Sequence, residues 1–232
     1  MTTPLTPIST PVSREQQAYE RIKEAILTFK LKPGQSLVEN ELASQLDISK
    51  TPVRDALLRL EKEGLVTRVL YKGASVAELN QRKMEEIFEI RAALEGLATY
   101  LATPFITKEE VLEAQRLVNA HAAALASGDI REASRLNRLF HELIVRKSPN
   151  QWLKDILSNL EDHLRRYRML SSFQGDRRDK SIVEHQRILD AIQRKDPEAA
   201  EKAMREHLMS VLSDLVRVHD FDEIIKRIIT EG

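Results

Sequence analysis

Cysteine is absent from this chain of 232 residues, which excludes disulfide bonds, thiolate metal ligands and cysteine nucleophiles. Glycine occurs only seven times and aromatic residues make up 5% of the chain, so an all-β sandwich fits poorly. Charged residues interrupt every apolar stretch well short of the roughly 20 residues that span a bilayer. We see no basic segment followed by an apolar one, the pattern of a signal peptide, at the start of the sequence. We therefore expect a cytoplasmic protein without a membrane anchor.

The chain also has no net charge. The chain carries 36 lysines and arginines against 36 aspartates and glutamates, so its overall charge gives no sign of nucleic-acid binding. Any DNA-binding function must therefore rest on where individual cations are placed. Hydrophobic residues make up 42% of the chain, in stretches rich in alanine, leucine, glutamate and arginine. This composition favours helices that bury a core.

The first 79 residues predict helices followed by a pair of strands. Residues 1–12 hold three prolines and no periodic pattern, which is typical of a flexible tail. A helix begins after Ser13, whose pairing with Gln16 is typical of a capping box. The stretch 39–66 predicts two short helices, and residues 65–76 predict two strands joined by a turn at 71–74. This order is that of a winged helix-turn-helix domain, to which we assign residues 13–79.

The second of the two short helices has the features of the recognition helix of a helix-turn-helix domain, here called the reading helix. Asp47 lies in the tight turn, where a left-handed conformation is tolerated, and Ser49 is expected to cap the helix. The buried stripe and the stop are formed by Val53, Ala56, Leu57, Leu60 and Gly64. Lys50, Thr51 and Arg54 must then face outward, near the helix end that meets the bases. Arg54 can grip a guanine edge with two hydrogen bonds, so we expect double-stranded DNA as a partner.

From residue 80 to the end, the sequence predicts only helices. We expect them at roughly 82–102, 107–127, 129–147, 150–173, 178–195 and 197–218, with a short tail helix after Phe221. Short breaks separate them, for example at Pro149, Gly175 and Pro197. Because loops this short join antiparallel neighbours, residues 80–232 predict an all-α antiparallel bundle. The fold class is therefore mainly α, with one small β-hairpin wing.

Two long motifs resemble a known family. PGQSLVENELASQLDISKTPVRDALLRLEKEGLV, followed by YKGASV, closely resembles the DNA-binding domain of GntR-family bacterial transcription regulators, including its L-x-E-x-x-L-A core. In the second half, EIFEIRAALEGLA, the N-x-x-F-H of residues 137–141, EHQRILDAI and MREHL resemble the FCD effector domain of the FadR-type subgroup. The resemblance implies a homodimeric regulator that binds a two-fold operator and responds to a small ligand, most often as a repressor.

The family's DNA contacts fall on a defined set of positions in this chain. They are Asn40, Ser49, Lys50, Thr51, Arg54 and the wing-tip Gly73, with Lys72 beside it. Family members often carry arginine at the positions of Asn40 and Lys50. Asn40 supplies no cationic phosphate contact, while Lys50 keeps the charge and loses the bidentate geometry of arginine.

Six histidines occur, all in the second half, and four of them are spaced by 22 residues. Because helix breakers interrupt any continuous helix, we treat that spacing as accidental. The resemblance implies a metal site on Asn137, His141, His185 and His207, and we expect the remaining three histidines at the surface or in the core. Asn137 lies one turn before His141, so both can face one cavity. Imidazole-rich ligation favours a divalent first-row ion, zinc or nickel above all, and the amide of Asn137 adds no negative charge.

Arg91 matches an arginine that lines the effector cavity of many FCD domains. A buried guanidinium needs a carboxylate partner. A small organic acid would supply one, and the alternative is an ion pair with Glu95, one helical turn away.

We therefore interpret the chain as a ligand-responsive transcription regulator and not as an enzyme. In this hypothesis, a small carboxylate binds the metal and Arg91 and changes affinity for the operator. One alternative is a metal-dependent enzyme with Glu142 or Glu184 as base, although no hydrolytic metal motif is present. The other is a DNA-binding dimer that has no small-molecule effector.

Overall fold

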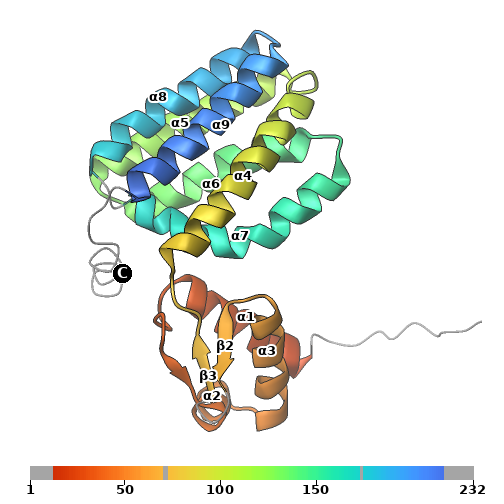
Figure 1. Cartoon of the computed structure of the whole chain (residues 1–232), viewed down its shortest axis with the longest axis vertical. Coiled ribbons are helices and arrows are strands. Elements are labelled where there is room, and N and C mark those ends of the chain that lie inside the picture. Colours follow the sequence, from red (N-terminus) through yellow and green to blue (C-terminus); the bar gives the residue numbers. More distant parts are fainter. Residues whose placement is uncertain (1–12, 70–72, 173–174, 217–232) are drawn as a thin grey trace, which may run out of the picture. The chain divides into compact units, whose positions relative to one another are not determined.

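The computed structural model describes residues 13–69, 73–172 and 175–216, and it divides the chain into two compact units (Figure 1). The first ends at Glu78 and the second begins at Leu79. No helix among these residues is long and apolar enough to cross a membrane. The predicted tail at 1–12, the wing residue Lys72 and the tail helix after Phe221 lie outside the described residues.

The first unit contains three helices and a small antiparallel sheet. The helices are α1 (Arg14–Leu27), α2 (Glu39–Leu46) and α3 (Lys50–Lys62), and the strands are β1 (Ser36–Leu37), β2 (Val66–Val69) and β3 (Gly73–Val76). Ser13 caps α1, because its side chain accepts a hydrogen bond from the backbone N–H of Gln16. The expected capping box is only half formed, since the Gln16 side chain instead contacts Glu20 and Arg59. Asp47 ends α2 in the left-handed conformation with φ of 53°, and this conformation produces the tight turn before α3.

The sheet has the strand order β1-β3-β2. β2 and β3 pair antiparallel from Val66 with Val76 to Val69 with Gly73. Two expectations need correction here. Gly73 and the residue after it begin β3 instead of lying in the turn, and the two-residue strand β1 was not predicted. A single apolar core joins the helices to the sheet, and the inward stripe of α3 is completely buried.

The second unit consists of six helices within the described residues. They are α4 (Gln81–Ala102), α5 (Lys108–Ser127), α6 (Ile130–Lys147), α7 (Gln151–Ser172), α8 (Gly175–Gln193) and α9 (Pro197–Val216). The helices expected between residues 82 and 218 are present in the described part of the unit, although α8 begins at Gly175, where the sequence predicts a break. Polar caps fix three of the starts: Asn80 caps α4, Thr107 forms a capping box at α5, and Asp129 caps α6.

The core of this unit is formed mainly by α4, α5, α6, α8 and α9 (Figure 1). Most of its side chains are aliphatic, with Phe140 among the largest. Several polar side chains are nevertheless almost fully buried in the unit: Arg91, Glu95, His121, His141, His185 and His207. Since burying polar groups is costly unless they are paired or bind a ligand, this group marks the candidate site of the bundle.

Candidate DNA-binding surface and candidate metal centre

The N-terminal end of α3 presents its predicted DNA-reading residues to solvent. Ser49, Lys50, Thr51 and Arg54 are all exposed, because the opposite stripe of the helix packs into the core. Ser49 takes the N-cap position as predicted, but its side chain makes no capping hydrogen bond. Its hydroxyl and the first backbone N–H groups of α3 can therefore face a phosphate.

Arg54 forms an ion pair that the sequence reasoning missed. Its Nε and Nη2 atoms donate to the Oε2 atom of Glu39 at 3.1 and 3.0 Å. The hydrogen bond and charge of Glu39 raise the pKa of Arg54 above its ordinary value. The same carboxylate lies 3.6 Å from Nη2 of Arg68, which also pairs with Glu61 at 3.5 Å. Glu39 is the glutamate of the L-x-E motif quoted above, so the signal was present in the sequence.

The other predicted DNA contacts are placed separately. Asn40 is exposed in the first turn of α2. Gly73 is exposed with φ of 82°, and a Cβ atom added there would meet nothing within 4 Å. That φ value favours glycine because other residues rarely adopt it. The open space around Gly73 would allow a nucleic-acid backbone to approach closely.

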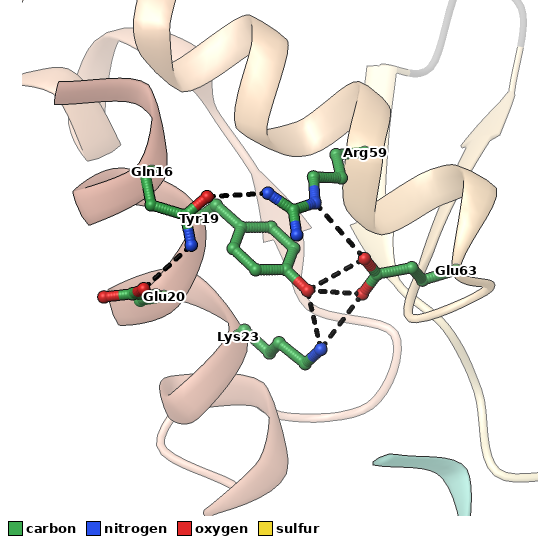
Figure 2. Close-up of polar contacts among 6 residues, drawn as sticks. All are labelled: Gln16, Tyr19, Glu20, Lys23, Arg59 and Glu63. Carbon is green, nitrogen blue, oxygen red and sulfur yellow. Dashed lines mark hydrogen bonds and ion pairs between the residues drawn. The ribbon is translucent and has the colours of Figure 1, made fainter. Parts of the chain in front are cut away.

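A polar network fixes α1 against α3 (Figure 2). The hydroxyl of Tyr19 donates to the Glu63 carboxylate at 2.8 Å, and Lys23 donates to the same carboxylate at 3.2 Å. Arg59 lies over the Tyr19 ring with Cζ 3.7 Å from the ring centroid, and it also donates to Gln16. Burial raises the pKa of Tyr19 above its usual value, so the hydroxyl keeps its proton. These contacts bind α3, whose N-terminal end carries the reading residues, to the first helix.

Three histidines meet inside the helical unit although they lie on three different helices. His141 on α6, His185 on α8 and His207 on α9 each offer a ligand atom, and these atoms lie within 4.8 Å of one another. Their ring centroids are 4.6 to 5.5 Å apart. His163, which continues the 22-residue spacing, lies on α7 and does not belong to this cluster. The spacing was accidental as a helical pattern, yet three of the four residues converge.

Two carboxylates hold two of these imidazoles. Nδ1 of His141 donates to Glu95 at 2.6 Å, and Nδ1 of His207 donates to Glu184 at 2.8 Å. A carboxylate on Nδ1 fixes the tautomer and directs Nε2 toward a metal, as in many metalloproteins. Asn137 lies one turn before His141 on α6, and its Oδ1 atom is buried and accepts no hydrogen bond from the described residues, so this oxygen is available as a further ligand atom. The donor set therefore suits an ion such as zinc or nickel.

Arg91 forms the ion pair with Glu95 that was expected from the sequence as the alternative to an effector contact. Its Nε atom donates to Glu95 at 2.5 Å, and both side chains are buried. Burial alone would raise the pKa of Glu95, but the charges of Arg91 and His141 outweigh burial and hold that pKa well below its usual range. The two carboxylates also add negative charge next to the histidines. The centre is therefore less positive than its neutral ligands alone suggested.

His121 is a neighbour of the cluster that sequence reasoning placed outside it. It lies on α5, is 4% exposed, and its ring centroid is 5.6 Å from that of His185. Burial, followed by the charge of His207, lowers the pKa of His121 to about 4. It is a core histidine, one of the two possibilities expected, and it is neutral near pH 7.

A cavity of about 440 Å³ opens beside His141, between α4, α5, α6 and α7. Glu95 and His141 line it, so it reaches the candidate metal centre. Its lining also includes three cationic side chains, Arg138, Arg146 and Lys154, and the carboxylates Glu113 and Glu161. Glu142 also lines it but pairs with Arg138 at 2.6 Å, and Glu184 is bound to His207. Both carboxylates considered as bases for an enzyme are thus held in other contacts.

An exposed reading helix, an open glycine in the wing strand and a separate helical unit with a buried polar site define one class of protein. The class is the DNA-binding transcription regulator with a second, helical domain. Comparisons with known proteins agree. The model for bacterial regulatory proteins of the gntR family matches residues 14–76, and the model for the FCD domain matches residues 86–210.

The chain belongs to the GntR family, with the FadR-type combination of a GntR and an FCD domain. It is 32% identical to the uncharacterized HTH-type transcriptional regulator YdhC of Bacillus subtilis, over 93% of this chain and 92% of that one. It is 26% identical to the HTH-type transcriptional repressor RspR of Escherichia coli, over 87% of this chain and 88% of that one. The solved structure of Escherichia coli McbR/YncC is 28% identical and matches with a TM-score of 0.71, covering 89% of this chain and all of the other. These names describe transcription regulators, not enzymes.

Proposed function

We propose that this protein is a metal-dependent repressor that releases or alters its operator contacts when a small organic acid binds. The observation that carries the proposal is the convergence of three buried histidines, one of which, His141, lines a cavity that also holds three cationic side chains. Some relatives are named repressors, among them RspR and a probable D-xylose utilization operon repressor of Paenarthrobacter nicotinovorans.

In this proposal, His141, His185, His207 and Asn137 hold a zinc or nickel ion. Such an ion supplies a Lewis-acidic position for a carboxylate. The protein's own cations orient the rest of the acid: Arg138, Arg146 and Lys154 line the same cavity. Arg91 remains a candidate effector contact. The carboxylate of the effector would bind Arg91 in place of the Glu95 carboxylate that now pairs with it. A ligand of this kind would disturb the chain of contacts from Arg91 through Glu95 to His141.

The DNA-binding form in the proposal is a homodimer on a two-fold operator. One head exposes few cations, so two linked heads are needed for useful affinity. An exposed apolar surface on the helical unit supports this. Ile90 and Leu97 on α4 are 49% and 40% exposed, and Trp152 and Ile156 on α7 are 81% and 46% exposed. The two helices pack against each other (Figure 1), and apolar surface of this kind marks protein–protein contacts.

The test is a comparison of metal content and operator binding in the full chain. Protein purified without a chelator or a histidine tag is analysed for metal, and its preferred DNA is selected from random duplexes. Affinity for that DNA is then measured with and without a panel of small organic acids, before and after metal removal. We expect at least one acid to change the affinity by about fivefold or more, in metal-loaded protein alone.

His141→Ala should lose both the metal and the response to the acid, while His163→Ala keeps both. Equal metal content in wild type and His141→Ala would contradict the metal site. An operator affinity that no acid changes would favour the DNA-binding dimer without an effector, and turnover of an acid would favour the enzyme.

A further inference from the structure

Glu39 places a negative charge within the surface that is proposed to meet DNA. It is the first residue of α2, directly before Asn40, and its carboxylate contacts two arginines from two other elements. Arg54 comes from the reading helix α3, and Arg68 comes from β2, a strand of the wing. A carboxylate here repels phosphates, so its presence costs affinity for every DNA sequence.

The geometry of the Arg54 pair leaves one edge of its guanidinium available. Nε and Nη2 donate to Glu39, and no hydrogen bond to the described residues uses Nη1. Of the five N–H donors of an arginine, Glu39 therefore takes those along the Nε–Nη2 edge. The Nη1–Nη2 edge remains, and two parallel donors on one edge are what the O6 and N7 atoms of guanine require. Glu39 fixes the plane in which that edge is presented.

The pair contributes little to folding, because the Arg54 side chain is 58% exposed and water screens such contacts. It has a larger effect on how Arg54 meets DNA. With its charge offset by Glu39, Arg54 adds little to the general attraction for phosphates. When the surface closes on a groove and water leaves, the contact with Glu39 becomes stronger and holds the guanidinium in place.

We propose that Glu39 is a positioning residue that reserves Arg54 for a guanine and lowers affinity for DNA of any other sequence. The inference rests on the proposed role of Arg54 in reading a base. Arg68 supports the arrangement from the other side, because it binds both Glu39 and Glu61 and so ties the wing strand to α2 and α3. Specificity at one base pair in each half-site thus depends on a residue that need not touch the base.

The experiment compares Glu39→Gln with Glu41→Gln in the full chain. Both changes remove one carboxylate from the first turn of α2, and of these two glutamates it is Glu39 that is hydrogen-bonded to Arg54. Affinity is measured for the selected operator, for operators substituted at each guanine, and for unrelated duplex DNA, over a range of salt concentrations. Circular dichroism and thermal unfolding verify that each variant is folded.

We expect Glu39→Gln to lower the preference for one guanine about tenfold and to bind unrelated DNA more tightly, with a steeper salt dependence. Glu41→Gln should change affinity for all duplexes by one common factor. In an Arg54→Ala background, Glu39→Gln should have no further effect on base preference. Equal base preferences in Glu39→Gln and Glu41→Gln would overturn this inference alone. A normal guanine preference in Arg54→Ala would overturn the reading role of Arg54 and the inference with it.

Discussion

Replacing Glu95 by glutamine tests the buried polar chain of the helical unit. The Glu95 carboxylate is 5% exposed and joins Nε of Arg91 at 2.5 Å to Nδ1 of His141 at 2.6 Å. The amide of Glu95→Gln would take the Glu95 negative charge away from the buried Arg91 guanidinium. Breaking a buried pair in this way costs about 3–5 kcal/mol. For a chain of this size, that corresponds to a fall in Tm of roughly 6–20 °C.

The same change should weaken metal binding. Loss of a carboxylate behind a ligating imidazole costs about 10–100-fold in metal affinity. Glu184→Gln is the matched control, because Glu184 holds His207 in the same way but is 12% exposed. It should lose metal affinity to a similar degree, with a stability loss of only about 1–2 kcal/mol. Differential scanning fluorimetry and competition with a metal indicator measure the two effects.

A second substitution separates charge from packing. Arg91→Met in the Glu95→Gln background removes the buried cation that has lost its contact with the Glu95 charge, and it should restore much of the stability without restoring the metal affinity. If Glu95→Gln and Glu184→Gln lowered Tm equally, the argument from the buried arginine would be refuted. If Glu95→Gln bound metal as tightly as wild type, its role behind His141 would be refuted.

Three further predictions follow from the site and the surfaces. His121 has a folded pKa of about 4 against an ordinary 6.5, so the unfolded chain takes up its proton first as the pH falls. The free energy of unfolding should then drop by about 3 kcal/mol between pH 6.5 and pH 4, and urea titrations of His121→Leu with a chelator present should lack that contribution. Arg54→Ala should lose about 1–3 kcal/mol of operator binding and lower the base specificity at one position of each half-site, while Lys72→Ala weakens binding to all sequences alike. Unchanged operator affinity in Arg54→Ala would argue against base reading. Trp152→Glu places a charge at a position whose side chain is 81% exposed, so the monomer should stay folded. Analytical ultracentrifugation should show loss of the dimer, and a persistent dimer would exclude the apolar side chains of α4 and α7 as the dimer contact.

Local patterns were sufficient to predict most of the fold. Helix periodicity, the cap at Ser13 and the left-handed turn at Asp47 each depend on neighbours a few residues away, and the structure confirms all three. β1 was missed because two residues carry no alternation, and Leu37 is held there by pairing with distant Ala74. The start of α8 was misplaced because glycine was read as a break, although a first helical turn tolerates it.

The candidate site was harder to predict because its contacts join residues far apart in the chain. Arg91 and Glu95 are one turn apart, so their ion pair could be considered from the sequence. The contact between Glu95 and His141 joins α4 to α6, and no local pattern contains it. His121 illustrates the same limit, since its place beside His185 depends on how α5 packs against α8. The proposed metal ligands were predicted from the family resemblance and not from periodicity.

The three clustered imidazoles belong to three helices that are separate segments of the chain. An ion bound to them would act as a reversible cross-link between α6, α8 and α9. At a free metal concentration of about 100 times the dissociation constant, such a cross-link adds about 2.7 kcal/mol to stability, and well below that constant it adds almost nothing. The supply of metal in the cell would then determine how often these helices open, and slowed amide hydrogen exchange in α6, α8 and α9 would record it.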